Sequence, residues 1–133
     1  MLLELDVEYD IDFLLLGLSC FEKDYRLCWL INKQLGVAFS RADDLCLLRN
    51  DVEQCFPRFT YSWESEDAEL TLLKNRTAAG VLLPELRQVD YLLKVDAEDL
   101  PQDLVEQVRQ VPRVAAVFVL EPNGLKEKEV LLF

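Results

Sequence analysis

The 133-residue chain contains no histidine. Histidine is the commonest general base at neutral pH and the commonest metal ligand, so Ser–His and Cys–His nucleophilic sites cannot form within this chain. The four glycines stand far apart and form no glycine-rich phosphate loop. Paired carboxylates remain conceivable as a catalytic site, but with 25 acidic residues a pair arises easily by coincidence and is weak evidence for catalysis. We therefore expect a protein without catalytic activity and without a cofactor.

The cysteines lack the short paired spacing that zinc ribbons and redox sites use. They are Cys20, Cys28, Cys46 and Cys55. In a reducing compartment such residues are buried, free thiols. The spacing predicts four free thiols, no disulfide and no metal site.

Basic residues are also scarce, with 14 against 25 acidic ones and a formal net charge of −11. This charge repels phosphate backbones and anionic lipid headgroups, so neither nucleic acid nor a membrane surface is an expected partner. The apolar run at 13–18 is far too short to span a bilayer. The opening residues lack the basic start of a signal peptide, so we expect a cytoplasmic protein.

The N-terminal part alternates apolar and acidic residues from Leu3 to Phe13. Alternation with period two predicts one long strand, or two strands that meet at a bend. Leu14 to Leu18 is solidly apolar, which indicates a strand covered on both faces. No linker interrupts the sequence, so residues 1–133 are expected to form a single domain.

A helix is predicted from about Cys20 to Leu35. Ser19 and Glu22 have the spacing of a capping box at its start, and Gly36 is placed to end it. Its core stripe is Leu27, Ile31 and Leu35.

The remaining elements follow from alternation, turn residues and apolar runs. Residues 37–56 give mixed signals and no assignment. We predict a hairpin of 59–63 with 70–73, a loop at 75–80, strands at 89–95, 114–120 and 130–133, and a helix at 101–110 with Asp99 as its N-cap and Leu104 and Val108 inward.

The predicted strand, helix and strand within 89–120 form a split βαβ unit, the building block of ferredoxin-like domains. This layout resembles the second half of the amino-acid-sensing ACT domains. The N-terminal strand, helix and hairpin supply the other half. The expected fold is an α+β sandwich, a mainly antiparallel sheet with two helices on one face.

Residues 83–91 read Leu-Pro-Glu-Leu-Arg-Gln-Val-Asp-Tyr. This string resembles the name-giving motif of the IPExxxVDY family of small bacterial proteins, with Leu83 in place of isoleucine. Segments 24–27 and 31–33 resemble the N-terminal pattern of that family. The resemblance implies a bacterial cytoplasmic protein and implies no reaction.

Four polar residues of this motif are candidate site residues: Glu85, Arg87, Asp90 and Tyr91. They either form a small polar pocket for a ligand or fix the turn into the next strand through hydrogen bonds. We favour the structural role, which predicts that Asp90→Asn and Glu85→Gln lower the melting temperature.

Two aromatic features have alternative interpretations. Arg26, Trp29 and Lys33 share the predicted first helix and are a candidate protein interface, because Arg and Trp are enriched in binding hot spots. The bland alternative is a solvated helix face. The stripe of Phe59, Tyr61 and Trp63 could stack on planar ligands, but one hairpin face must be buried, so we expect it in the core.

Three functions follow. The favoured one is an interaction module that dimerises or binds another protein through its sheet edge or first helix. The second is an ACT-like domain that binds an amino acid or similar small metabolite between two copies. The third, less favoured, is an enzyme that uses Glu85 and Asp90.

Overall fold

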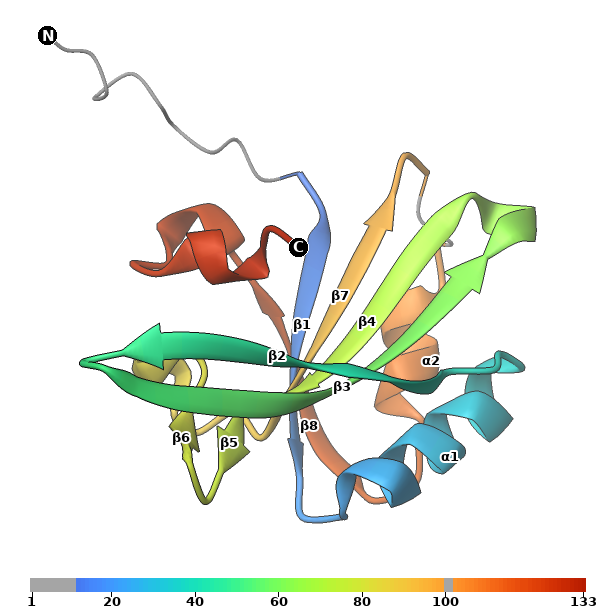
Figure 1. Cartoon of the computed structure of the whole chain (residues 1–133). Helices are drawn as coiled ribbons and strands as arrows, with labels where there is room; N and C mark the ends of the chain where they lie inside the picture. Colours follow the sequence, from blue (N-terminus) through green and yellow to red (C-terminus); the bar gives the residue numbers. More distant parts are fainter. Residues whose placement is uncertain (1–11, 100–101) are drawn as a thin grey trace, which may run out of the picture.

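The structure, a computed structural model, describes residues 12–99 and 102–133 (Figure 1). Its main sheet has six strands in the order β2-β3-β4-β7-β1-β8, and every neighbouring pair is antiparallel. These strands are β1 (Leu14–Cys20), β2 (Ser40–Arg49), β3 (Val52–Trp63), β4 (Ala68–Lys74), β7 (Tyr91–Ala97) and β8 (Val114–Leu120). A small ribbon joins β5 (Arg76–Thr77) and β6 (Gly80–Val81). The predicted α+β class is confirmed.

The helices of the described ranges are α1 (Asp24–Leu35) and α2 (Leu104–Arg109), with short 3₁₀ turns η2 (Glu64–Glu66), η3 (Pro84–Leu86), η4 (Pro122–Gly124) and η5 (Lys128–Leu131). The inner order β4-β7-β1-β8 interleaves two βαβ units, one containing α1 and the other α2. This is the split βαβ arrangement. The β2–β3 hairpin extends the sheet beyond it, on the β4 side.

One face of the sheet packs against both helices. Leu16 and Leu18 of β1 share a buried apolar cluster with Ile31 of α1 and Val108 of α2. Figure 1 shows the two helices on the same side of the sheet. Phe59 lies in this cluster, and Tyr61 and Trp63 pack against it, as predicted for that stripe.

The opposite face is covered by irregular chain. Leu15 and Leu92 point there, as the alternation along β1 and β7 requires, and they pack against Leu83, Val89 and Leu131. The segment that resembles the IPExxxVDY motif is therefore the cover of a second apolar core.

The start of the first helix is corrected. Ser19 belongs to β1, where its register partner is Ala116, and no side chain caps the helix at its N-cap, Lys23. The pairing of β1 with β8 continues to Cys20, so the capping-box spacing arises by coincidence inside a strand and the loop after it. The end is confirmed, because Gly36 adopts the left-handed conformation with φ 68°.

Other boundaries differ as well. Helix α2 begins after Asp103, later than predicted. Residues 128–131 form a 3₁₀ turn that buries Leu131, so the predicted last strand is wrong. The unassigned stretch 37–56 contains β2 and the start of β3. The predicted strand at 3–13 lies outside the described residues, apart from Asp12 and Phe13, which are not in a strand.

No helix in the part of the chain that the structure describes is long and apolar enough to cross a membrane.

The prediction of four free thiols is contradicted. Cys46 and Cys55 are register partners on β2 and β3 and are joined by a disulfide. Cys20 and Cys28 are free and buried. Sequence spacing did not reveal the pair because residues 37–56 had no assigned hairpin, and only the hairpin register places these two side chains opposite each other.

We therefore expect two reactive thiols, and not four, when the purified protein is unfolded without reductant and titrated with a thiol reagent. After reduction the count should rise to four. A cross-link of this short separation stabilises a fold by about 2–3 kcal/mol in the chain-entropy account, so the reduced protein should melt at a lower temperature. Four thiols without reduction would contradict the disulfide.

Candidate functional sites

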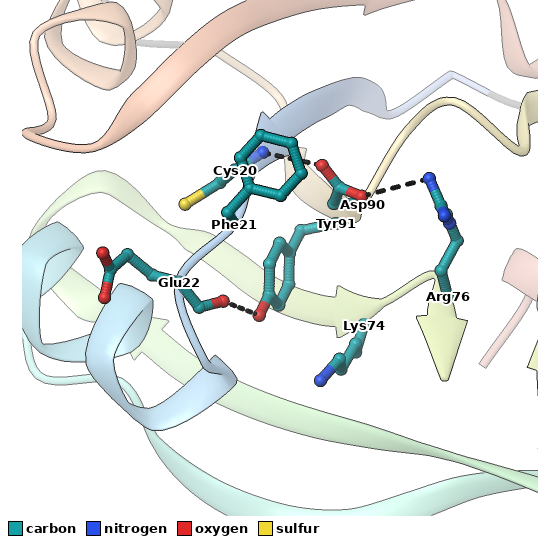
Figure 2. A pocket seen from close by; sticks show the side chains of 7 residues that line it. All are labelled: Cys20, Phe21, Glu22, Lys74, Arg76, Asp90 and Tyr91. Carbon is teal, nitrogen blue, oxygen red and sulfur yellow. Dashed lines mark hydrogen bonds and ion pairs between the residues drawn. The ribbon is translucent and has the colours of Figure 1, made fainter. Parts of the chain in front are cut away.

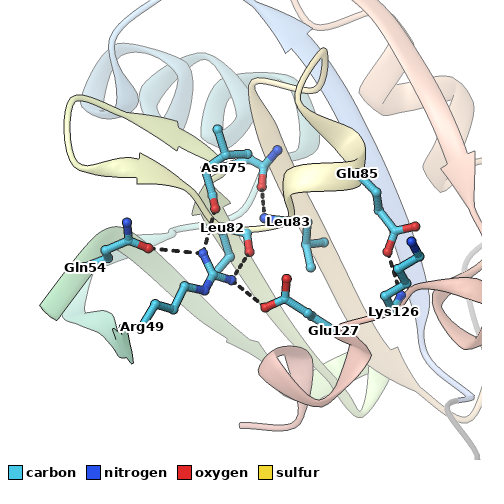
Figure 3. A network of polar contacts seen from close by, with 9 residues as sticks. Arg49, Gln54, Asn75, Leu82, Leu83, Glu85, Lys126 and Glu127 are labelled. Carbon is cyan, nitrogen blue, oxygen red and sulfur yellow. Dashed lines mark hydrogen bonds and ion pairs between the residues drawn. The ribbon is translucent and has the colours of Figure 1, made fainter. Parts of the chain in front are cut away.

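Asn75 organises the motif segment. Its side chain is fully buried. The amide nitrogen donates to the carbonyl oxygens of Leu86 (3.0 Å) and Val89 (2.8 Å), and the amide oxygen accepts the backbone N–H of Leu83 at 2.9 Å. Figure 3 shows Asn75 beside this loop. One side chain thus fixes both ends of the chain between β6 and β7.

Arg49, at the end of β2, holds the outer side of the same loop. Its guanidinium donates to the carbonyl oxygens of Val81 (2.8 Å) and Leu82, and it pairs with Glu127 at 3.0 Å (Figure 3). The β2–β3 hairpin, the motif loop and the C-terminal turns are therefore tied together by one cation.

The four predicted motif residues are only partly brought together. Exposed Glu85 accepts the backbone N–H of Lys126 at 2.6 Å and so clamps the C-terminal turns. Arg87 is exposed, and its side chain makes no hydrogen bond or ion pair among the described residues. Asp90 and Tyr91 lie on the other side of the loop, at a hollow that neither Glu85 nor Arg87 lines. The proposed Glu85–Asp90 pair does not form.

The hollow has a volume of about 210 Å³ and is shown in Figure 2. It is lined by Cys20, Phe21, Glu22, Lys74, Arg76, Asp90 and Tyr91. One carboxylate oxygen of Asp90 accepts the backbone N–H of Cys20 at 2.8 Å, and the other pairs with Arg76 at 3.4 Å. Asp90 therefore joins β1 to β7 where the two strands meet the loop.

Tyr91 has its ring in the helix-side core and donates its hydroxyl to the carbonyl oxygen of Glu22. Burial raises the pKa of this phenol well above its ordinary value, and nearby acidic groups, led by Asp24, add to the rise. In the unfolded chain the phenol ionises near pH 10. The folded state therefore holds its proton more strongly, and this contribution to stability disappears as the pH rises above about 10.

We expect Tyr91→Phe to flatten the loss of unfolding free energy above pH about 10. At neutral pH the variant should be less stable by about 1 kcal/mol, because one hydrogen bond is lost. Denaturant titrations at a series of pH values measure both effects. Tyr25→Phe is the control, since Tyr25 is 64% exposed. An unchanged alkaline slope in Tyr91→Phe would contradict the assignment.

The exposed face of α1 carries the predicted interface residues. Trp29 is 50% exposed, and both Arg26 and Lys33 stack on its ring, with 5.4 and 4.7 Å between the charged group and the ring centre. Tyr25, one turn before Trp29, continues this face toward the N-terminus and is 64% exposed. Two cations thus lie over the half-exposed indole, and we call Arg26, Trp29 and Lys33 the α1 patch.

Sequence reasoning missed Lys94, which lies in the middle of β7 and is 6% exposed. Its ammonium donates to the carbonyl oxygen of Leu131 at 2.7 Å and lies 4.1 Å from the ring centre of Phe133. Burial lowers the pKa of this lysine. A charged residue inside an apolar strand was the available signal. Lys94 therefore anchors the C-terminal turns to β7.

Within the described ranges, the side chains close enough together to hold a metal ion are Cys46, Glu53 and Cys55. The two sulfur atoms are bonded to each other, so they offer no thiolate ligands.

The two edges of the sheet differ sharply. Edge strand β2 carries four charged residues and a bulge between Ala42 and Leu45. Such features prevent an edge from pairing with another chain. Edge strand β8 reads Val-Ala-Ala-Val-Phe-Val-Leu and has no charge, although it too has a bulge, at Ala115, in its pairing with β1. Its outer side has no strand partner within residues 12–99 and 102–133.

Comparisons with protein-family models, with curated proteins and with solved structures found no match to this chain. Membership of the IPExxxVDY family stays a prediction.

Proposed function

We propose that this protein is an interaction module that forms a homodimer by pairing the outer edges of two β8 strands. The observation that carries the proposal is the contrast in charge between the two sheet edges, since β2 carries four charged residues and β8 is apolar and carries none. Phe118 and Val119 are 43% and 54% exposed on the open edge. A second strand would satisfy its outward backbone groups and cover these side chains.

The absence of histidine from the sequence supports binding over catalysis. A cytoplasmic, bacterial origin remains part of the proposal. The Cys46–Cys55 disulfide counts against a reducing cytoplasm, because disulfides persist mainly in oxidising compartments. Dimerisation through β8 does not depend on the compartment.

The test is sedimentation equilibrium over a wide range of protein concentration. We expect a dimer for the wild type and a monomer for Val119→Lys, because a charge inside the new strand pair must be desolvated. Val119 is half exposed, so the variant should keep the circular dichroism spectrum and melting behaviour of a folded monomer. Leu48→Lys, at a 73% exposed position on β2, is the matched control and should remain dimeric.

The first helix is the competing surface. Arg26→Ala combined with Trp29→Ala removes the core of the α1 patch and should leave the dimer intact. If this variant dissociates while Val119→Lys does not, the interface is the α1 face and the proposal is wrong. A wild type that is monomeric at every concentration would also overturn it.

A second candidate function is binding of a small zwitterionic metabolite such as an amino acid. The supporting observation is the hollow in Figure 2, where Lys74 and Arg76 lie near Asp90 and Glu22, so that both signs of charge line one space. A thermal-shift screen with free amino acids tests this candidate. A stabilising ligand whose effect is lost in Lys74→Ala would support it.

A further inference from the structure

We infer a specific register for the pairing, in which two β8 strands run antiparallel about a two-fold axis at Val117. Each Val117 then lies opposite its own copy, and Arg113 of one chain lies beside Glu121 of the other. This inference rests on the proposed dimer and adds the geometry of its interface. A two-fold interface must be self-complementary, and three features of β8 meet that requirement at this register.

The first feature is charge. Arg113 is the turn residue before the strand (φ 75°) and Glu121 follows the strand, so an antiparallel pair brings long side chains of opposite charge near each other at both ends. Parallel pairing would place like charges side by side. Within its own chain, Arg113 is 68% exposed and has only a long contact of 3.8 Å with Glu22, so it is available to a partner.

The second feature is side-chain size. In an antiparallel pair, residues directly opposite each other lie on the same face. On the face away from the helices, Phe118 lies opposite Ala116 of the second copy. On the helix face, Val119 lies opposite the bulge that Val114 and Ala115 form in the second copy. The large exposed side chain of Phe118 thus meets an alanine, and Val119 meets the bulge that contains Ala115.

The third feature is a groove of about 370 Å³ beside the strand. It is lined by Arg109, Val114, Ala115, Ala116 and Val117. Because Ala115 lies in the groove and faces Val119 of the second copy, the valine enters this space. The groove runs between β8 and the end of α2, where part of the apolar edge is not covered by its own chain.

Neighbouring registers lose these matches. Moving the axis to Ala116 places Arg113 opposite Val119 and Phe118 opposite Val114. Moving it to Phe118 places the two phenylalanines opposite each other and Glu121 opposite Ala115. Only the register about Val117 pairs both the charges and the sizes.

A charge exchange tests the register. In Arg113→Glu the two chain ends would present glutamate to glutamate, and in Glu121→Arg they would present arginine to arginine. We expect each variant alone to dimerise roughly tenfold more weakly than the wild type at low salt, with the difference shrinking at high salt. An equimolar mixture should form heterodimers, because both contacts then join opposite charges.

Native mass spectrometry of the mixture, with one variant labelled with ¹⁵N, counts homodimers and heterodimers. The expected result is an excess of heterodimer over the statistical half. Effects within one chain, such as loss of the Glu22 contact, cannot produce that preference. A statistical mixture, with a wild type that is dimeric and dissociated by Val119→Lys, would overturn the register and leave the proposed dimer standing. A monomeric wild type, or a dimer that survives Val119→Lys, would overturn both.

Discussion

Replacing Asn75 with alanine is expected to cost about 3–5 kcal/mol of unfolding free energy. The substitution leaves the N–H of Leu83 and the carbonyl oxygens of Leu86 and Val89 without their partner, at a position that is fully buried. Each unsatisfied buried group costs about 1–3 kcal/mol. The total is a large share of the roughly 5–15 kcal/mol that stabilises a domain. Urea denaturation at neutral pH measures the loss.

Asn32→Ala is the control, because Asn32 also bridges backbone groups but at a less buried position. Asn32 bridges the backbone N–H and carbonyl oxygen of Phe39 at 2.8 and 3.2 Å, but its side chain is only half-buried. Water replaces part of what is lost, so we expect a cost of about 1 kcal/mol. An Asn75→Ala variant no less stable than Asn32→Ala would show that the loop is not held by this side chain.

The second large effect is expected at Asp90. Asp90→Ala removes the acceptor for the N–H of Cys20 and the partner of Arg76, and should lower the unfolding free energy by about 2 kcal/mol. Asp90→Asn keeps an amide oxygen as acceptor and should lose about half as much. Glu85→Gln should have the smallest effect, because the residue is exposed and glutamine can still accept from Lys126.

Thermal melts of these three variants without ligand separate a structural carboxylate from a functional one. Functional sites concentrate uncompensated charge, so neutralising a binding carboxylate often stabilises the protein. If Asp90→Asn melts at a higher temperature than the wild type, Asp90 belongs to a ligand site and the hollow beside it becomes the leading candidate.

Regular, repetitive patterns predicted much of the fold. The apolar run that became β1 and the run at Val114–Leu120 that became β8 were recognised because burial on a sheet gives continuous apolar sequence. Gly36 was recognised because a left-handed helix end favours glycine. The helix start predicted at Ser19 was wrong, because the capping-box spacing carries no information on whether that part of the chain is already paired in a strand.

The residues that organise the candidate sites could be identified only once the fold was known. Asn75 looks like an ordinary loop residue in the sequence, and its three hydrogen bonds are created by the return of residues 83–89 around it. Cys46 and Cys55 become neighbours only through the β2–β3 register. The open edge of β8 is likewise a consequence of strand order, which alternation along a single strand does not encode.

Amide hydrogen exchange along the two edge strands, measured by NMR at low and high protein concentration, tests the proposed dimer most directly. The outward amides of β8 should exchange rapidly in dilute solution and become protected as the concentration rises, because the second copy supplies their hydrogen-bond acceptors. The amides of β2 should not change. Outward β8 amides that stay unprotected at every concentration, or protection that grows on α1 or β2 instead, would contradict dimerisation through β8.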